Sequence, residues 1–259
     1  PHIIALASAL PIITDTVIID GLTQPSSSCT APLIVLDGSA GVANGIEITA
    51  GFSQISGLVI NGFSNAGIAI TTNGGNTIEC SFIGTNAAGT AAVPNGTGIQ
   101  VNSGINTIGN PGLGNVISGN TTSGISLAGA GTSGNIISYN KVGTDVTGAS
   151  ALGNGGEGIL AALGASNTTI ANNVIANNGT SGVAIGISTA DTSTFTNLIQ
   201  QNSIVNNGGL GIDLGNNATI ETIDGLGFDS GPNQLQNQPT LSNAFITTST
   251  IDVAGNLTS

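Results

Sequence analysis

The stretch GISLAGAGTSGNIISYNKV, residues 124–142, contains both sequence patterns that decide the fold. It opens with Gly-Ile-x-Leu, and it ends with Ile-x-x-Asn-x-Val from Ile137 to Val142. The first pattern recurs, with small variations, at Gly45, Gly67, Gly98, Gly124, Gly158, Gly182 and Gly211. The second recurs between these glycines, beginning at Ile55, Ile78, Ile137, Ile170 and Ile199, with a split form at Ile108 and Ile117. Self-similarity at a nearly fixed interval is the signature of a repeat architecture.

Each repeat holds three short β-type segments, separated by clusters of Gly, Asn and Ser that suit turns, and no stretch keeps a helical period. We therefore predict an all-β protein, a right-handed parallel β-helix of about seven to eight coils with a C-terminal β tail. A sandwich or barrel is the alternative, and it would need hairpin signals and longer alternating strands. The predicted inward columns contain Ile68, Ile70, Ile125, Leu127, Val183 and Ile185.

The second pattern also aligns one turn position across the coils. Two residues before its closing aliphatic residue, successive repeats carry Leu58, Ser81, Asn115, Asn140, Asn173 and Asn202. Stacked amides can hydrogen-bond to one another along the axis and satisfy buried backbone groups. We therefore predict an asparagine ladder through Asn115, Asn140, Asn173 and Asn202.

Two repeats carry similar insertions, FIGTNAAGTAAVPNG at residues 82–96 and KVGTDVTGASALGNG at residues 141–155. We call them the first and the second insertion segment. They fall in alternate coils, so they are expected to protrude on one side, roughly 10 Å apart. Such insertions either form a binding face or are simply solvated loops.

The chain divides into a β-helix domain, residues 1–241, and a tail, residues 242–259. Residues 245–257 alternate well enough to be a strand. A β-helix exposes unpaired backbone groups at its terminal coils. The strand is therefore expected to add to a neighbouring module or subunit, or else to fold back over the last coil. Because the chain begins at Pro1 without an initiator Met or a signal peptide, we expect a processed piece of a longer protein.

The charge balance excludes two classes of partner. Lys141 is the single basic side chain against 13 carboxylates, and the formal net charge is -12. A protein of this charge has no phosphate-gripping surface for nucleic acid and no polybasic patch for a membrane. The apolar runs are far shorter than the roughly 20 residues of a membrane-spanning helix, so membrane insertion is not expected.

Several phrases resemble a known family. LASALPIITDTVIIDGLTQP (residues 6–25), LIVLDGS (33–39), and GIDLGNN (211–217) followed by GPNQLQNQPTL (231–241) resemble β-helix modules of large secreted bacterial surface proteins. These modules belong to the pectin-lyase-like right-handed β-helix superfamily. The resemblance implies an extracellular or cell-surface location and a non-catalytic structural or adhesive role, as an adhesin-like stalk or a filament or sheath subunit. Surface glycans or proteins would be further partners.

The same superfamily contains polysaccharide lyases and glycoside hydrolases, so a site near the C-terminal coils is the alternative. Lyases of this kind use a basic residue beside calcium-binding acids, but the positions that align with Lys141 in other coils carry no acid. The outward position of the Gly-Ile-x-Leu strand carries acids only at Glu47 and Asp213, six coils or roughly 29 Å apart. Glycosidases need two carboxyl groups roughly 5 to 9.5 Å apart. Only Asp191, Asp224 and Asp229 could converge on Asp213, and acids scattered on loops are usually just solvated. We therefore expect no catalytic residues and no enzyme.

Calcium is the one cofactor that the sequence suggests. Asp224 and Asp229 flank a Gly-rich loop near Asn233, and backbone carbonyls could complete an oxygen shell; the alternative is an acidic turn. Cys29 and Cys80 form an even pair in a chain expected to be secreted, which favours a disulfide. Their coils are however expected to lie roughly 10 Å apart, beyond the about 7 Å between Cα atoms that a disulfide spans. Both outcomes stay open for this pair.

Overall fold

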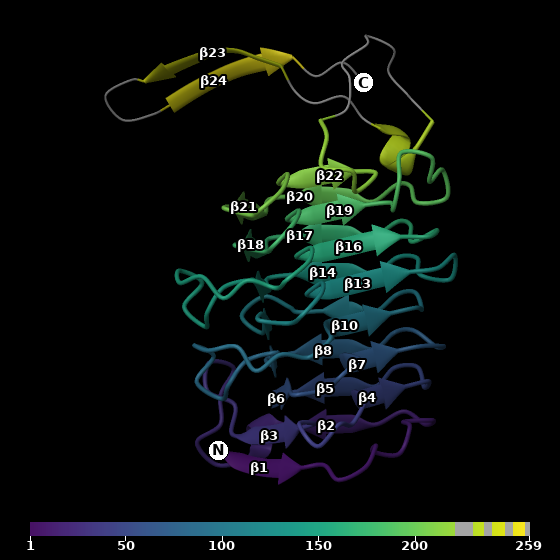
Figure 1. Cartoon of the computed structure of the whole chain (residues 1–259), viewed down its shortest axis with the longest axis vertical. Helices are drawn as coiled ribbons and strands as arrows, with labels where there is room; N and C mark the ends of the chain where they lie inside the picture. Colours follow the sequence, from purple (N-terminus) through teal and green to yellow (C-terminus); the bar gives the residue numbers. More distant parts are fainter. Residues whose placement is uncertain (221–229, 236–239, 247–250, 257–259) are drawn as a thin grey trace.

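Three parallel sheets wind around one axis and make a solenoid (Figure 1). The computed structural model describes residues 1–220, 230–235, 240–246 and 251–256. We label the three sheets A, B and C; their strands are given below. The chain passes from sheet C to sheet A to sheet B and then starts the next coil. Thus β2, β3 and β4 form coil 1, and β20, β21 and β22 form coil 7. The strand β1 precedes coil 1 and pairs with β3. The predicted all-β parallel β-helix is therefore confirmed, with seven strands in each of sheets B and C and eight in sheet A.

The strands are two to five residues long within these sheets. Sheet A contains β1 (His2–Ala5), β3 (Ile34–Asp37), β6 (Leu58–Asn61), β9 (Phe82–Ile83), β12 (Val116–Ile117), β15 (Lys141–Val142), β18 (Val174–Ala176) and β21 (Ser203–Val205). Sheet B contains β4 (Asn44–Ile48), β7 (Ala66–Ile70), β10 (Thr97–Val101), β13 (Ile125–Ala128), β16 (Ile159–Ala162), β19 (Val183–Ile185) and β22 (Ile212–Leu214). Sheet C contains β2 (Ile18–Asp20), β5 (Gln54–Ser56), β8 (Thr77–Glu79), β11 (Thr107–Ile108), β14 (Ile136–Ser138), β17 (Thr169–Ala171) and β20 (Leu198–Gln200).

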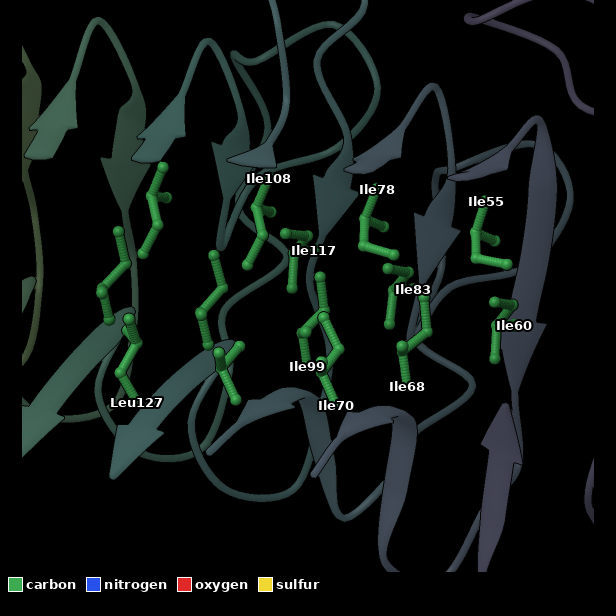
Figure 2. Close-up of a cluster of buried hydrophobic side chains, with 14 of the residues drawn as sticks. Ile55, Ile60, Ile68, Ile70, Ile78, Ile83, Ile99, Ile108, Ile117 and Leu127 are labelled. Carbon is green, nitrogen blue, oxygen red and sulfur yellow. The ribbon is translucent and has the colours of Figure 1, made fainter. Parts of the chain in front are cut away.

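Aliphatic side chains fill the interior in columns that run along the axis (Figure 2). In sheet B, Ile68 pairs with Ile99 and Ile99 with Ile125, so equivalent residues of successive coils lie on top of one another. All six residues predicted to point inward are fully buried. Burying each such side chain contributes roughly 1.5–3 kcal/mol, and this periodic burial explains why the repeat dictates the fold.

Residues 245–257, predicted as one strand, contribute to two strands in the structure. The strands β23 (Thr240–Ile246) and β24 (Ile251–Asn256) pair antiparallel, with a register shift between Leu241 and Asn243. The pairing observed is therefore a hairpin, and whether this hairpin joins a neighbour or caps the last coil stays a prediction. The domain boundary after residue 241 stays a prediction. Two short helical turns, η1 (Gly21–Thr23) and η2 (Pro232–Leu235), complete the described elements.

Candidate functional site

The turn between sheets C and A carries the predicted ladder. The side-chain amide of Asn115 donates to the amide oxygen of Asn140 at 2.9 Å, Asn140 donates to Asn173 at 3.0 Å, and Asn173 donates to Asn202 at 3.0 Å. The same oxygens accept the backbone N–H of the preceding coil's ladder residue, as in Asn115 N to Asn140 Oδ1 at 3.1 Å. Because Asn115, Asn140 and Asn173 are each about 1% exposed, the ladder pairs buried backbone groups that would otherwise lack partners.

Two further ladders run along the other two turns, and the sequence interpretation missed them. In the turn between sheets A and B, each amide donates to the next at 2.9 to 3.1 Å through Asn95, Asn120, Asn154, Asn178 and Asn207. In the turn between sheets B and C, the same contact at 3.0 Å links Asn76, Asn106 and Asn135. A sequence signal existed for the longer of the two, because its members stand three or four residues before the recurring Gly-Ile.

The outer face of sheet B carries Glu47 and Asp213, the two acids predicted to share one outward column. The register confirms the predicted outward column, since Glu47 pairs with Ala69 and Asp213 with Ala184 at its two ends. Asp213 is 1% exposed, and its carboxylate accepts hydrogen bonds from Ser181 Oγ and from the backbone N–H of Asn217 and Ala218. The loop after β22 therefore covers this carboxylate.

Glu157 is the acid that the structure brings to the same loop, and the sequence interpretation did not name it. Its carboxylate accepts from Ser123 Oγ at 2.7 Å and from Asn216 Nδ2 at 3.0 Å, while the adjacent Asn217 N–H donates to Asp213. Burial alone would raise the pKa of Glu157, but the hydrogen bonds, led by the one from Ser123, lower it below its ordinary value. Glu157 and Asp213 thus both anchor the loop after β22.

Asp191, another acid proposed near the C-terminal coils, makes its hydrogen bonds elsewhere. Asp191 accepts hydrogen bonds from Leu163, Ser193 and Thr194. These bonds lower its pKa, although burial opposes the change. No hydrogen bond links Asp191 to Asp213. Asp224 and Asp229, the proposed calcium ligands, lie outside the described residues, and calcium binding there stays a prediction. Within the described part, no group of three His, Cys, Asp or Glu residues is arranged to hold a metal ion.

The two insertion segments have one backbone design. A bridge between Thr85 and Ala92 closes the first, and an equivalent bridge between Thr144 and Ala151 closes the second. The backbone N–H of Val146 donates to the carbonyl oxygen of Gly89 at 2.9 Å. The prediction that the segments stand roughly 10 Å apart is therefore wrong at their tips, because both lean over the intervening coil.

Beneath the segments, the outer face of sheet A carries an apolar strip. Phe82 and Lys141 both pair with Val116, so they occupy one outward column two coils apart. Phe82 is fully buried although it points away from the core, because it belongs to an apolar cluster with Val35, Val59 and Val116, against which Ala87 and Val146 of the insertion segments pack.

A disulfide joins Cys29 to Cys80, with 4.3 Å between their Cα atoms. Straight stacking of coils 1 and 3 would have kept them apart. The loop that carries Cys29 instead crosses the turn of coil 2 at Gly57, where a side chain would collide with Leu22. Gly57 has φ +69°, a conformation that glycine adopts without strain.

Next to this disulfide lies a pocket of about 180 Å³ on the outer face of sheet A. It is lined by Cys29, Thr30, Gly112, Gly114, Asn115, Val116, Tyr139, Lys141 and Val146. Among the described residues, neither the Lys141 ammonium nor the Tyr139 hydroxyl has a hydrogen-bond or ion-pair partner. The pocket therefore brings together the single Lys and the single Tyr of the chain.

Residues 44–224 match the family model described as a right handed beta helix region. The match covers more than half of the 259 residues, so the chain belongs to the right-handed β-helix family. Comparisons with curated proteins and with solved structures give no match. Right-handed β-helices include both structural and enzymatic proteins, so the function has to be argued from the sites.

Proposed function

We propose that this chain is a non-catalytic structural or adhesive module of an extracellular protein, related to the pectin-lyase-like β-helices of adhesin-like surface proteins. The observation that carries the proposal is the set of three amide ladders, one at each corner of the solenoid. They tie each coil to the next through side chains as well as through the sheets, which favours a stiff rod. In this role the chain would serve as a stalk or as a filament or sheath subunit.

The chemistry of the acids supports a non-catalytic role. A glycosidase needs one carboxyl group that can deliver a proton to substrate and a second that meets the sugar or a water. Asp213 is buried beneath the loop after β22, and Ser181, Asn217 and Ala218 occupy its oxygens. Lys141, the only side chain that could serve as a lyase base, makes no ion pair with an acid in the described part of the chain. We expect no catalysis from either arrangement.

The disulfide supports the extracellular location, because such bonds persist in oxidising compartments and are rare in the cytosol. Among the described residues, no helix is long and apolar enough to cross a membrane. For partners, we propose self-association or contact with neighbouring modules at the terminal coils. At one terminus all four residues of β1 are exposed, including Ile3 and Ile4. Apolar edge strands of this kind favour pairing with further chain.

One observation keeps a polysaccharide-degrading enzyme as the second candidate. Glu157 and Asp213 contact adjacent residues of one loop, Asn216 and Asn217, so a rearrangement of that loop would expose two carboxylates together. An activity assay separates the candidates. The protein is incubated with pectate, alginate and neutral glucans, with and without calcium, and unsaturated and reducing ends are measured. We expect no release; reproducible release that is lost in Asp213→Asn would overturn the non-catalytic proposal.

Assembly is tested separately by light scattering over a range of concentrations. The variant lacking residues 240–259 removes the whole β23–β24 hairpin and leaves the seven coils. If the hairpin joins neighbours, this variant dissociates at concentrations where the full chain is associated. Equal assembly masses for the full chain and the variant would contradict assembly through the hairpin. The terminal coils would then be the proposed site of contact between chains.

A further inference from the structure

The pocket beside the disulfide has an unusual composition for this protein. The chain holds one Lys, one Tyr and one disulfide among 259 residues, and all three contribute to the lining of this pocket. The other lining residues are apolar or present backbone, apart from Thr30 at the exposed rim and Asn115 of the buried ladder. The pocket therefore offers one cation, one aromatic ring and one hydroxyl on a mainly uncharged wall.

Lys141 is an unbalanced charge at this place. Its neighbours in the outward column are Val116 and Val174. Asp145, the acid in its own insertion segment, has its carboxylate occupied by Thr147, Ala149 and Ser150. Glu79, an acid of the sheet C strand two coils away, accepts from Gln54 and Asn110. Lys141 is half-buried, and its ammonium has no counter-ion among the described residues, which favours an anionic ligand because hydrogen bonds between ions are the stronger ones.

Tyr139 occupies a backbone position that does not suit it. The turn between sheets C and A places the residue before most ladder positions in the left-handed region, at Gly57 (φ +69°), Cys80 (φ +51°), Tyr139 (φ +60°), Asn172 (φ +58°) and Gln201 (φ +56°). Gly and Asn adopt this conformation readily, whereas a bulky residue there is strained. Left-handed backbone recurs at other turns of the solenoid, so the case for binding depends on what Tyr139 presents to the pocket. Tyr139 is 43% exposed and its hydroxyl has no partner among the described residues, so the side chain is accessible to a ligand.

We infer that this pocket binds a small carboxylate that carries one six-membered ring. The ammonium of Lys141 would pair with the carboxylate, and the ring of Tyr139 would lie against the ligand's ring. The volume is suitable, since a cavity of roughly 150 Å³ accepts benzene in another protein. The disulfide fixes the wall formed by Cys29 and Thr30. This binding goes beyond the structural role, which a rod without any ligand would fulfil equally well.

The test uses the single Tyr as its own reporter. The full chain is prepared with 3-fluorotyrosine, which gives one fluorine resonance, and is titrated with benzoate, glucuronate, benzyl alcohol and glucose. We expect a saturable shift with a dissociation constant of about 1 mM for at least one carboxylate, typical of a small contact. Its neutral counterpart should bind at least about 10-fold more weakly. Benzoate and glucuronate distinguish an aromatic ligand from a sugar acid. No saturation with either carboxylate, or equal shifts with the neutral compounds, would overturn the proposal.

Two variants locate the site. Lys141→Gln should weaken carboxylate binding at least about 10-fold, whereas benzyl alcohol or glucose should respond as before. The double variant Lys141→Val with Val174→Lys keeps the net charge and moves the ammonium one coil along the same column. This double variant should bind the carboxylate as weakly as Lys141→Gln does. If it binds the carboxylate with wild-type affinity, the attraction between the ammonium and the carboxylate is nonspecific and the proposed pocket is refuted. Thermal melts report whether each variant folds. If a variant does not fold, the comparison of carboxylates with their neutral counterparts on the wild-type protein decides whether the pocket binds a carboxylate.

Discussion

The two insertion segments and the residues just before them share one backbone and differ in what their side chains do. Cys80, Ser81 and Phe82 lead into the first segment, and Tyr139, Asn140 and Lys141 occupy the equivalent positions before and in the second. In the first segment, Asn86 Oδ1 accepts from the backbone of Thr90 and Ala91. Asp145 holds the equivalent place and accepts from Thr147, Ala149 and Ser150.

The difference teaches which features the loop requires. Both segments need an acceptor oxygen at one position, and a neutral amide serves as well as a carboxylate. The positions below the loop are free to vary: the first segment uses them to bury a ring and to form a disulfide, and the second presents a cation and a phenol. The first region is therefore mainly structural, and the second has the chemistry of a binding site.

The largest difference should lie at Phe82 and Lys141. Phe82→Ala removes a fully buried ring from the apolar strip and should cost about 3 to 5 kcal/mol of unfolding free energy. Lys141→Ala at the equivalent position should change it by at most about 0.5 kcal/mol. Denaturant titrations of both variants measure the two values. Similar changes in unfolding free energy for the two variants would mean that the apolar strip does not stabilise the first segment more than the second.

The disulfide should give the next largest effect. Cys29→Ser with Cys80→Ser should lower the free energy of unfolding by about 2 to 4 kcal/mol, since the bond restricts the unfolded chain. At the equivalent turn position, Tyr139→Asn should leave stability unchanged or raise it slightly, because Asn tolerates the left-handed conformation. Denaturation midpoints that match for the disulfide variant and the wild type would contradict the structural role of the first region.

The ladder position tests how far the two regions can be exchanged. Asn140→Leu strands the backbone N–H and side-chain amide of Asn115, so it should cost about 1 to 3 kcal/mol. Asn140→Ser, which copies Ser81, should cost less, because Ser81 Oγ still accepts the N–H of Leu58 at 3.3 Å. Thermal melts compare the pair. If both melt like the wild type, the ladder contributes no net stability.

The smallest effect concerns pH. The Thr147 hydroxyl, together with the N–H groups of Ser150 and Ala149, lowers the pKa of Asp145 from 3.8 to about 2, although burial opposes the change. A lowered pKa contributes stability that is present above pH 3.8 and is lost as the pH falls towards 2. The stability difference between wild type and Asp145→Asn should therefore shrink between about pH 5 and about pH 2. Asn86→Asp should create a weaker dependence of the same sign in the first segment, because Ala88 stands at the place of Thr147 and has no hydroxyl. A constant difference between wild type and Asp145→Asn across this range would contradict the assignment.

Much of this architecture could be predicted from sequence because it is periodic. The columns through Ile68 and Ile125, and the ladder through Asn140, follow from spacing alone. The remaining features depend on loops that leave the periodic path. An arrangement of straight stacked coils left the bond between Cys29 and Cys80 undecided, and it placed Gly89 too far from Val146. Such an arrangement does not show that a loop can lean across the coil between. Glu157 escaped notice because its link to the loop after β22 skips a coil.

Links between alternate coils have a consequence for how the protein unfolds. In a solenoid each unit contacts only its neighbours, so coils can detach one after another from an end. Here Cys29 to Cys80 joins coils 1 and 3, Val146 to Gly89 joins coils 5 and 3, and Asn216 to Glu157 joins coils 7 and 5. Every even-numbered coil is thereby bracketed, and the units behave less independently. The first link is covalent, the second combines a hydrogen bond with the packing of Val146 against the cluster of Phe82, and the third is a hydrogen bond worth about 1 kcal/mol. Resistance to pulling should therefore decrease from coil 1 towards coil 7.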